Sequence, residues 1–155
     1  MNVHTYEQGF LGLSAVLLAA ALGALGYAAW ARGIHLIGHA EQIDPAQVAT
    51  TPPFDAPGVR EVAPGRYQAV IVARTWFFTP HEIRVPVGAE VTFIATTPDV
   101  IHGLHVTGTR INLMLIPGQV TRFTYRFREP GAHLLVCHEY CGVGHHTMGG
   151  RVVVE

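Results

Sequence analysis

An uncharged apolar segment near the N-terminus is the feature that most constrains the fold of this chain. No Asp, Glu, Lys or Arg lies between Glu7 and Arg32. As a helix, residues 8–31 would be about 36 Å long, which is enough to cross the roughly 30 Å hydrocarbon layer of a membrane. The sequence therefore predicts one N-terminal transmembrane helix, which we assign to residues 1–32.

A cleaved signal peptide is the alternative interpretation of this segment, because Ala29-Trp30-Ala31 fits a small-x-small cleavage site. Two features weigh against it. The residues before the apolar run contain no Lys or Arg, and the run is longer than the apolar core of a secretory signal, which is about 7 to 15 residues. The charges that flank the segment do not decide its orientation in a membrane.

A proline-rich segment follows over residues 33–65. It includes Pro52-Pro53 and Pro57-Gly58, and it shows neither a helical nor a strand period. We therefore expect a partly extended connector between the helix and the rest of the chain.

Charged residues are few and nearly balanced. They make up 14% of the chain, and the formal net charge is -1. Such a balance creates no strong field that would attract nucleic acid, so we expect no nucleic-acid partner. The membrane lipid that we expect as a partner would contact the apolar helix.

Short β-rich runs separated by Gly and Pro begin at residue 66. In the clearest of them, Phe123, Tyr125 and Phe127 share one face, while the alternate positions carry Arg or Thr. Short strands at this spacing are typical of a β-sandwich. We expect one β-domain over residues 66–155, with strands near residues 67–73, 82–85, 90–95, 120–127, 132–136 and 151–154.

Four potential metal ligands lie in one loop between the last two expected strands. The loop reads Cys137-His-Glu-Tyr-Cys141-Gly-Val-Gly-His145-His-Thr-Met148. Thiolate and thioether sulfur together select copper over harder divalent ions, and imidazole suits copper equally well. The loop therefore predicts a copper site.

A further ligand must come from another part of the chain, and Asp99-Val-Ile-His102-Gly-Leu-His105 supplies two candidates. The segment follows one expected strand, and strand-end loops of a sandwich can meet at one pole. We prefer His102, because His105 opens an apolar run and can point into or across the sheet. Asp99 is expected either to accept a hydrogen bond from a ligand ring or to form an Asx-turn after Pro98.

Two other states of the loop remain possible. A disulfide between Cys137 and Cys141 is allowed in an oxidising compartment, but it explains neither His145 nor Met148. A zinc ion can take two cysteines and two histidines in a tetrahedral site. Thioether sulfur is a poor zinc ligand, so Met148 argues for copper.

Other aromatic and histidine residues are given structural roles. Two of the three residues Trp76, Phe77 and Phe78 are expected in the core. The histidines that break the ligand spacing are expected to be ordinary exposed residues: His4, His35, His39, His81, His133, His138 and His146.

The loop pattern Cys-x3-Cys-x3-His-x2-Met, with Asp-Val-Ile-His upstream, resembles the binuclear copper (CuA) domain of subunit II of cytochrome c oxidases. Phe78-Thr-Pro80 and Val91-Thr-Phe93 are similar to the first half of the cupredoxin fold in that family. The single helix is similar to the B-family branch. The resemblance implies a cupredoxin-like, Greek-key, all-β sandwich preceded by one N-terminal transmembrane helix.

The resemblance also implies a set of ligands for two copper ions. Cys137 and Cys141 would bridge both ions, and His102 and His145 would bind one each. Met148 would be a weak ligand, and Glu139 would contribute its backbone carbonyl. The neighbours Leu134, Leu135, Val136 and Val143 are expected to keep water away from the ions.

The function that the resemblance implies is electron transfer into a respiratory oxidase, with no acid–base catalysis by this chain. The copper centre would take electrons from a cytochrome c and pass them to haem in subunit I, where oxygen is reduced. The copper domain would lie on the periplasmic or extracellular side of the cell membrane. The alternative is a membrane-anchored copper-binding or electron-transfer module that has no oxidase partner.

Overall fold

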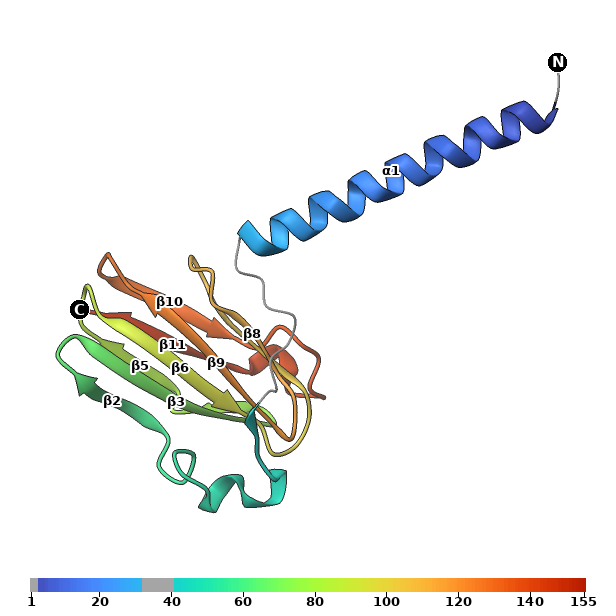
Figure 1. The fold of residues 1–155 in the computed structure, drawn as a ribbon. Coiled ribbons are helices and arrows are strands. Elements are labelled where there is room, and N and C mark those ends of the chain that lie inside the picture. The colour runs from blue at the N-terminus through green and yellow to red at the C-terminus, as the bar shows by residue number, and fades with distance from the viewer. Residues whose placement is uncertain (1–2, 32–40) are drawn as a thin grey trace. The chain divides into compact units, whose positions relative to one another are not determined.

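The computed structural model describes residues 3–31 and 41–155, which fall into two compact units, a helix and a β-domain (Figure 1). The helix α1 runs from Val3 to Ala31, and within the described residues none of its side chains is buried. Its most apolar window has a mean hydropathy of 2.0. By length and composition, α1 can cross a membrane.

The β-domain is a sandwich of two mixed sheets (Figure 1). The first sheet contains, in order, β1 (Glu41–Gln42), β9 (Gln119–Arg126), β6 (Glu90–Thr96), β3 (Arg66–Arg74) and β2 (Gly58–Ala63), and β4 (Phe77–Thr79) pairs with β3. The second contains β5 (Glu82–Val85), β11 (Gly149–Val154), β10 (Gly131–Val136), β7 (His102–Val106) and β8 (Asn112–Leu115). β3 pairs with β6 and β5 with β11 in parallel, and the other pairs are antiparallel.

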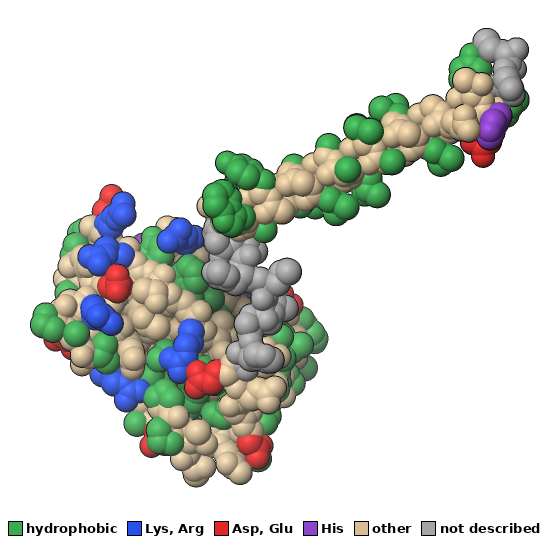
Figure 2. Space-filling view, in the orientation of Figure 1, with side chains coloured by type: hydrophobic (Ala, Val, Ile, Leu, Met, Phe, Trp, Pro, Cys, Tyr) green, Lys and Arg blue, Asp and Glu red, His purple; other side chains and the backbone are tan. Residues whose placement is uncertain are grey.

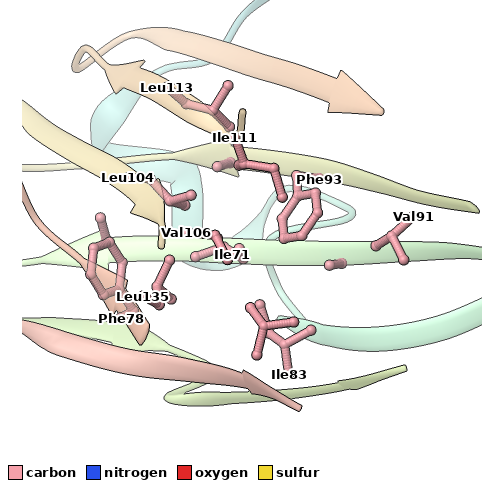
Figure 3. Packing of buried hydrophobic residues seen from close by; sticks show 14 of the residues in the cluster. Ile71, Phe78, Ile83, Val91, Phe93, Leu104, Val106, Ile111, Leu113 and Leu135 are labelled. Atoms are coloured by element: carbon pink, nitrogen blue, oxygen red, sulfur yellow. The ribbon is translucent and has the colours of Figure 1, made fainter. Parts of the chain in front are cut away.

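The main core lies between the two sheets, where apolar side chains from both layers meet (Figure 3). Phe93 on β6, Leu104 on β7 and Leu135 on β10 are fully buried there. Burial of each such side chain contributes about 1.5–3 kcal/mol. The predicted alternation on β9 is confirmed, since Phe123 and Tyr125 pack against this core and Phe127 lies in it.

All six expected strands are present, as β3, β5, β6, β9, β10 and β11. Local pattern does not predict the strands β1, β2, β4, β7 and β8. β1, β4 and β8 have only two, three and four residues, and β7 holds a glycine and two histidines among its five, so their strand pattern is weak. β2 has six residues but lies in the segment expected to be a connector.

The described part of the expected connector, residues 41–65, is packed onto the β-domain. A second apolar cluster joins Ile43, Val48 and Phe54 of this segment to the outward face of the first sheet, at Val70, Val72, Ile94 and Val120. The 3-10 helix η1 (Pro45–Thr50) is capped by the Asp44 side chain, which accepts a hydrogen bond from the Ala46 N–H at 3.0 Å. Residues 33–40 lie outside the described residues.

Residues 41–65 pack on the first sheet because its strand β3 is buried on both faces. Every residue from Ala69 to Ala73 is buried, so the outward-facing Val70 and Val72 need a cover of their own. The segment 41–65 supplies that cover. The β-domain therefore starts at the beginning of β1, well before residue 66.

Candidate metal centre

The loop over residues 137–148 joins two adjacent antiparallel strands, β10 and β11. Val136 pairs with Gly149 at the end of the ladder, and the Cys137 N–H donates a hydrogen bond to the Met148 carbonyl at 3.2 Å. The 3-10 turn η2 (His145–Thr147) then brings the Met148 N–H to the His145 carbonyl at 3.1 Å. The two ends of the loop are thus held together by the sheet.

Strand β7 lies next to β10 and carries His102 to the same place. Val136 pairs with His105 in the antiparallel register, so the start of β7 lies beside the loop that follows β10. His102 is fully buried, and its Nδ1 lies 3.8 Å from the Cys137 Sγ. The His105 Nδ1 instead donates to the Ile111 carbonyl at 2.9 Å. The structure therefore brings His102, and not His105, to the loop.

The remaining candidate ligands converge on the same two sulfurs. The Sγ atoms of Cys137 and Cys141 are 3.9 Å apart. The His145 Nδ1 and the Met148 Sδ each lie 3.5 Å from the Cys141 Sγ. The Glu139 carbonyl oxygen lies 3.2 Å from the Cys137 Sγ. All six predicted residues thus present a donor atom at one buried site.

The donor set favours a soft metal ion over a disulfide. Both cysteines are free thiols, and their 3.9 Å separation compares with about 2.05 Å between bonded sulfurs. The ligand atoms of His102, Cys137 and Cys141 all lie within 4.8 Å of one another. This arrangement can accept metal without movement of the strands.

Comparisons with known proteins agree with this geometry. The family model described as "Cytochrome C oxidase subunit II, periplasmic domain" matches residues 61–155. Cytochrome c oxidase subunit 2 of Thermus thermophilus is 38% identical over 154 residues, which are 97% of this chain and 92% of that protein. The chain belongs to the cytochrome c oxidase subunit II family.

Solved structures confirm the fold of this subunit II. A chain of a heme-copper terminal oxidase dimer has 36% identity and a TM-score of 0.68, and the match covers 97% of this chain and 99% of that one. The periplasmic domain of subunit II from Bradyrhizobium japonicum has 19% identity and a TM-score of 0.53, over 57% of this chain and 83% of that domain. The predicted cupredoxin-like sandwich with an N-terminal apolar helix is confirmed.

Asp99 fixes the orientation of the His102 ring in this subunit II. Its Oδ1 accepts a hydrogen bond from the His102 Nε2 at 2.9 Å, which leaves Nδ1 facing the sulfurs. The same carboxylate accepts hydrogen bonds from Thr75 N–H, Thr97 Oγ1 and Val100 N–H at 2.7–2.8 Å. Of the two roles considered for Asp99, the structure shows the hydrogen bond to the His102 ring. Among the described residues no Asx-turn forms at Asp99, because its side chain accepts from the next residue, Val100, and not from the residue two positions on.

Hydrogen bonds also control the charge of Asp99. Burial raises the pKa of this carboxyl group, but the hydrogen bonds from Thr75, His102, Val100 and Thr97 outweigh burial and lower the pKa below its usual value. Asp99 is thus a carboxylate at neutral pH, and it can polarise the imidazole that it holds.

The Cys141 thiol shows the opposite behaviour. Burial raises the pKa of Cys141, and the adjacent Cys137 raises it further by repulsion between the two thiolates. A thiolate at Cys141 would therefore be stabilised by a cation beside it, and metal binding would release the Cys141 proton.

Trp76 covers the ligand loop from outside. Its indole Nε1 donates a hydrogen bond to the Cys141 carbonyl at 3.2 Å. The ring lies so close to the loop that a Cβ atom at Gly144 would overlap it, and Gly142 adopts a φ of +115° beside it.

The expectation that two of Trp76, Phe77 and Phe78 lie in the core is wrong, because only Phe78 is buried. No local pattern in the sequence predicts that a loop passes under Trp76.

The expected apolar shield is only partly correct. Leu135 is fully buried and Val136 half-buried, but Leu134 is 62% exposed and Val143 82% exposed. Leu134 does not shield the site from water, because alternate residues of β10 face opposite sides of the sheet. The side chains of Cys137, Cys141 and Met148 lie instead within the main core, and Trp76 covers the backbone of the loop at Cys141.

The other histidines mostly follow expectation. His4, His81, His138 and His146 are exposed. His133 is half-buried, and its Nδ1 donates to the Thr107 carbonyl at 2.9 Å. His35 and His39 lie outside the described residues.

Asp99→Asn is expected to lower the free energy of unfolding of the metal-free chain by about 1–3 kcal/mol at pH 7, because an amide cannot accept all the hydrogen bonds that the carboxylate accepts. Asp55→Asn, at an exposed position, should cost less than about 0.5 kcal/mol. Urea unfolding in mild detergent, followed by intrinsic fluorescence, measures both.

The contribution of Asp99 to the free energy of unfolding should depend on pH. Since the folded-state pKa of Asp99 is lowered, its carboxylate stabilises the fold above about pH 4, and this contribution is lost as the pH falls toward the folded-state pKa. The difference between wild type and Asp99→Asn should therefore shrink on acidification. A difference that grows below pH 4 would contradict the role given to Asp99.

Proposed function

We propose that Cys137, Cys141, His102, His145, Met148 and the Glu139 carbonyl hold two copper ions in a binuclear CuA centre. The single observation that carries this proposal is the convergence of all six donor atoms on one buried pair of sulfurs. The sulfurs are 3.9 Å apart, less than twice a metal–thiolate bond of about 2.3 Å. An ion on either side can therefore bond to both.

The donor types support copper over zinc. A single zinc ion would be satisfied by two thiolates and two imidazoles. The Met148 Sδ would then have no partner, although it lies in the core, 3.5 Å from the Cys141 Sγ. Thioether sulfur is a ligand that selects copper.

When bound, the copper pair supplies a centre that takes up and releases one electron. The protein residues keep the cost of that change small. Cys137 and Cys141 would share the charge between the two ions that they hold, and Asp99 restrains rotation of the His102 ring. Burial of Cys137, Cys141 and Met148 excludes water that would otherwise reorient around the charge.

As a subunit II, this chain is the subunit through which electrons enter a cytochrome c oxidase. We infer that a cytochrome c is oxidised at the copper domain, and that the electron passes to haem in subunit I. Helix α1 would anchor the chain in the cell membrane as a single span in contact with lipid, with the copper domain on the periplasmic or extracellular side. The stand-alone copper module finds no support in the comparisons.

An exposed apolar surface surrounds the proposed centre and is suited to the donor. It consists of Trp76, Ile101, Tyr140 and Val143, of which Tyr140 is 79% and Val143 82% exposed. Tyr140 also packs edge-on against the His145 ring, with centroids 5.8 Å apart. A partner docked here would lie directly over the ligand loop. Because the surface is apolar, the interaction should depend little on salt.

Cys137→Ser and Cys141→Ser are each expected to abolish the binuclear centre, and His145→Ala to disrupt it, because each variant removes a donor. His146→Ala is the matched control, since His146 is exposed and adjacent, and it should retain two coppers. Met148→Leu should retain copper but shift its potential. Metal analysis and electron paramagnetic resonance of the full chain measure these outcomes. Two coppers in either serine variant would refute the assignment.

Purification in mild detergent tests the oxidase partner. The chain is expected to copurify with a larger haem-containing subunit, because members of this family belong to oxidase complexes. Haem spectra and subunit composition of the purified material provide the measurement. If the intact chain is isolated with copper but without haem, the stand-alone module is the better description.

The donor surface is tested by the rate of electron transfer from a reduced cytochrome c. We expect this rate to change by less than about threefold between low and moderate ionic strength. Val143→Ser should slow the reaction, whereas Val62→Ser, at an exposed position on β2, should not. A tenfold or greater loss with added salt would point to a charged interface.

A further inference from the structure

We propose that a groove at the end of the β-domain remote from the proposed copper centre binds a phosphate-bearing organic anion of nucleotide size. The groove lies between the turn that joins β7 and β8, the end of β9 and the start of β10, and its volume is about 610 Å³. Sites for small organic ligands typically measure about 300–1,000 Å³. The volume is therefore that of a ligand site.

The groove is separate from the ligand loop along β10. His133, near the start of this strand, lines the groove, whereas Cys137 follows the end of the strand. Gly131 pairs with Val154, so the groove lies at the end of the domain where the chain terminates. This proposal does not depend on the identity of the metal.

Three arginines give the groove its charge. Arg126 is partly engaged, since it forms an ion pair with Glu90 at 3.1 Å. Arg110 and Arg128 have no hydrogen bond or ion pair with any described residue and are exposed. Figure 2 shows basic side chains gathered toward this end of the face that it presents. Among the described residues that line the groove, Glu129 is the sole acidic one. Because Arg126 is already paired with Glu90, the unpaired guanidinium groups of Arg110 and Arg128 stand against one carboxylate.

The floor of the groove is aromatic and fixed in place. Tyr125 meets Phe127 edge-on with ring centroids 4.9 Å apart, and Phe127 lies 5.8 Å from His133. Because the His133 Nδ1–H donates a hydrogen bond to the Thr107 carbonyl, the imidazole ring cannot turn freely. Gly108, at a φ of +72°, lets the adjacent turn pass close to that ring. The floor is thus preorganised before any ligand arrives.

These features select a ligand class. Guanidinium groups bind phosphate oxygens through two parallel hydrogen bonds, and two unengaged arginines on separate walls suit a ligand with more than one phosphate. The half-buried rings of Tyr125 and His133, backed by the buried Phe127, suit a flat ring beside the phosphates. A nucleoside di- or triphosphate combines both parts, whereas a simple carboxylate would leave most of the donors unused.

Calorimetric titration of the full chain in mild detergent, without divalent metal, tests this assignment. The probes are ATP, pyrophosphate and adenosine. We expect saturable ATP binding that weakens by at least about tenfold in the double variant Arg110→Gln with Arg128→Gln. The matched control Arg60→Gln with Arg66→Gln removes the same charge from exposed positions at β2 and β3 and should bind ATP within about twofold of wild type. ATP should also raise the unfolding temperature of the wild type.

Several results would overturn the proposal. These are no saturable ATP binding by the wild type, equal weakening in the two double variants, or pyrophosphate binding as tight as that of ATP, which would remove the role of the aromatic floor. Binding only to vesicles of an anionic phospholipid would assign the arginines to a membrane surface instead. Both double variants change exposed side chains, and their unfolding temperatures without ATP verify that they fold.

Discussion

The antiparallel pairing of β10 with both β7 and β11 is the constraint on which the proposed centre depends. Its pairing with β11 closes the ligand loop, and its pairing with β7 sets His102 beside that loop. Because side chains alternate between the faces of a strand, a shift of one residue between β7 and β10 would turn the His102 ring away from the sulfurs. The core residues Leu104 and Leu135 oppose such a shift, because it would expose them. The register that packs the core is therefore the register that assembles the donor atoms.

Asp99 extends this control beyond the sheet. One of its carboxylate oxygens holds the His102 ring, and the other accepts the Thr75 N–H, next to Trp76. Trp76 in turn donates to the Cys141 carbonyl. A ligand ring, an aromatic cover and the cysteine loop are thus joined through three segments distant in sequence. Because these contacts share one carboxylate, a change at Asp99 should disturb the orientation of His102 and the cover of the loop together.

The sequence was sufficient for the parts of this subunit that depend on local pattern. The loop from Cys137 to Met148 could be identified because its ligands lie close together along the chain, and the long strands because their alternation is regular. The preference for His102 over His105 rested on weaker grounds, since it depends on the register between strands. The proline-rich pattern of residues 41–65 predicts a connector and conceals three apolar residues, Ile43, Val48 and Phe54, that pack on the first sheet. The uninterrupted apolar run of β3 was the available signal, since a strand apolar on both faces needs a cover on each. The contact of Trp76 with Gly144 could not be predicted, because only the fold brings them together.

The two ends of the β-domain differ in chemistry and are joined by strand β10. Around the ligand loop the exposed side chains include the apolar Trp76, Tyr140 and Val143 together with His138 and His146, whereas three arginines line the groove at the other end. An anion in that groove would lie remote from an incoming electron donor and would not compete with it for the apolar surface. Between the two ends runs β10, paired on both sides and buried at Leu135. A close-packed interior has low compressibility and transmits strain, so a displacement at His133 would reach the Cys137 loop along β10. The His133 ring is already held by the Thr107 carbonyl, and an anion that leaves this ring in place would act on electron transfer through its charge alone.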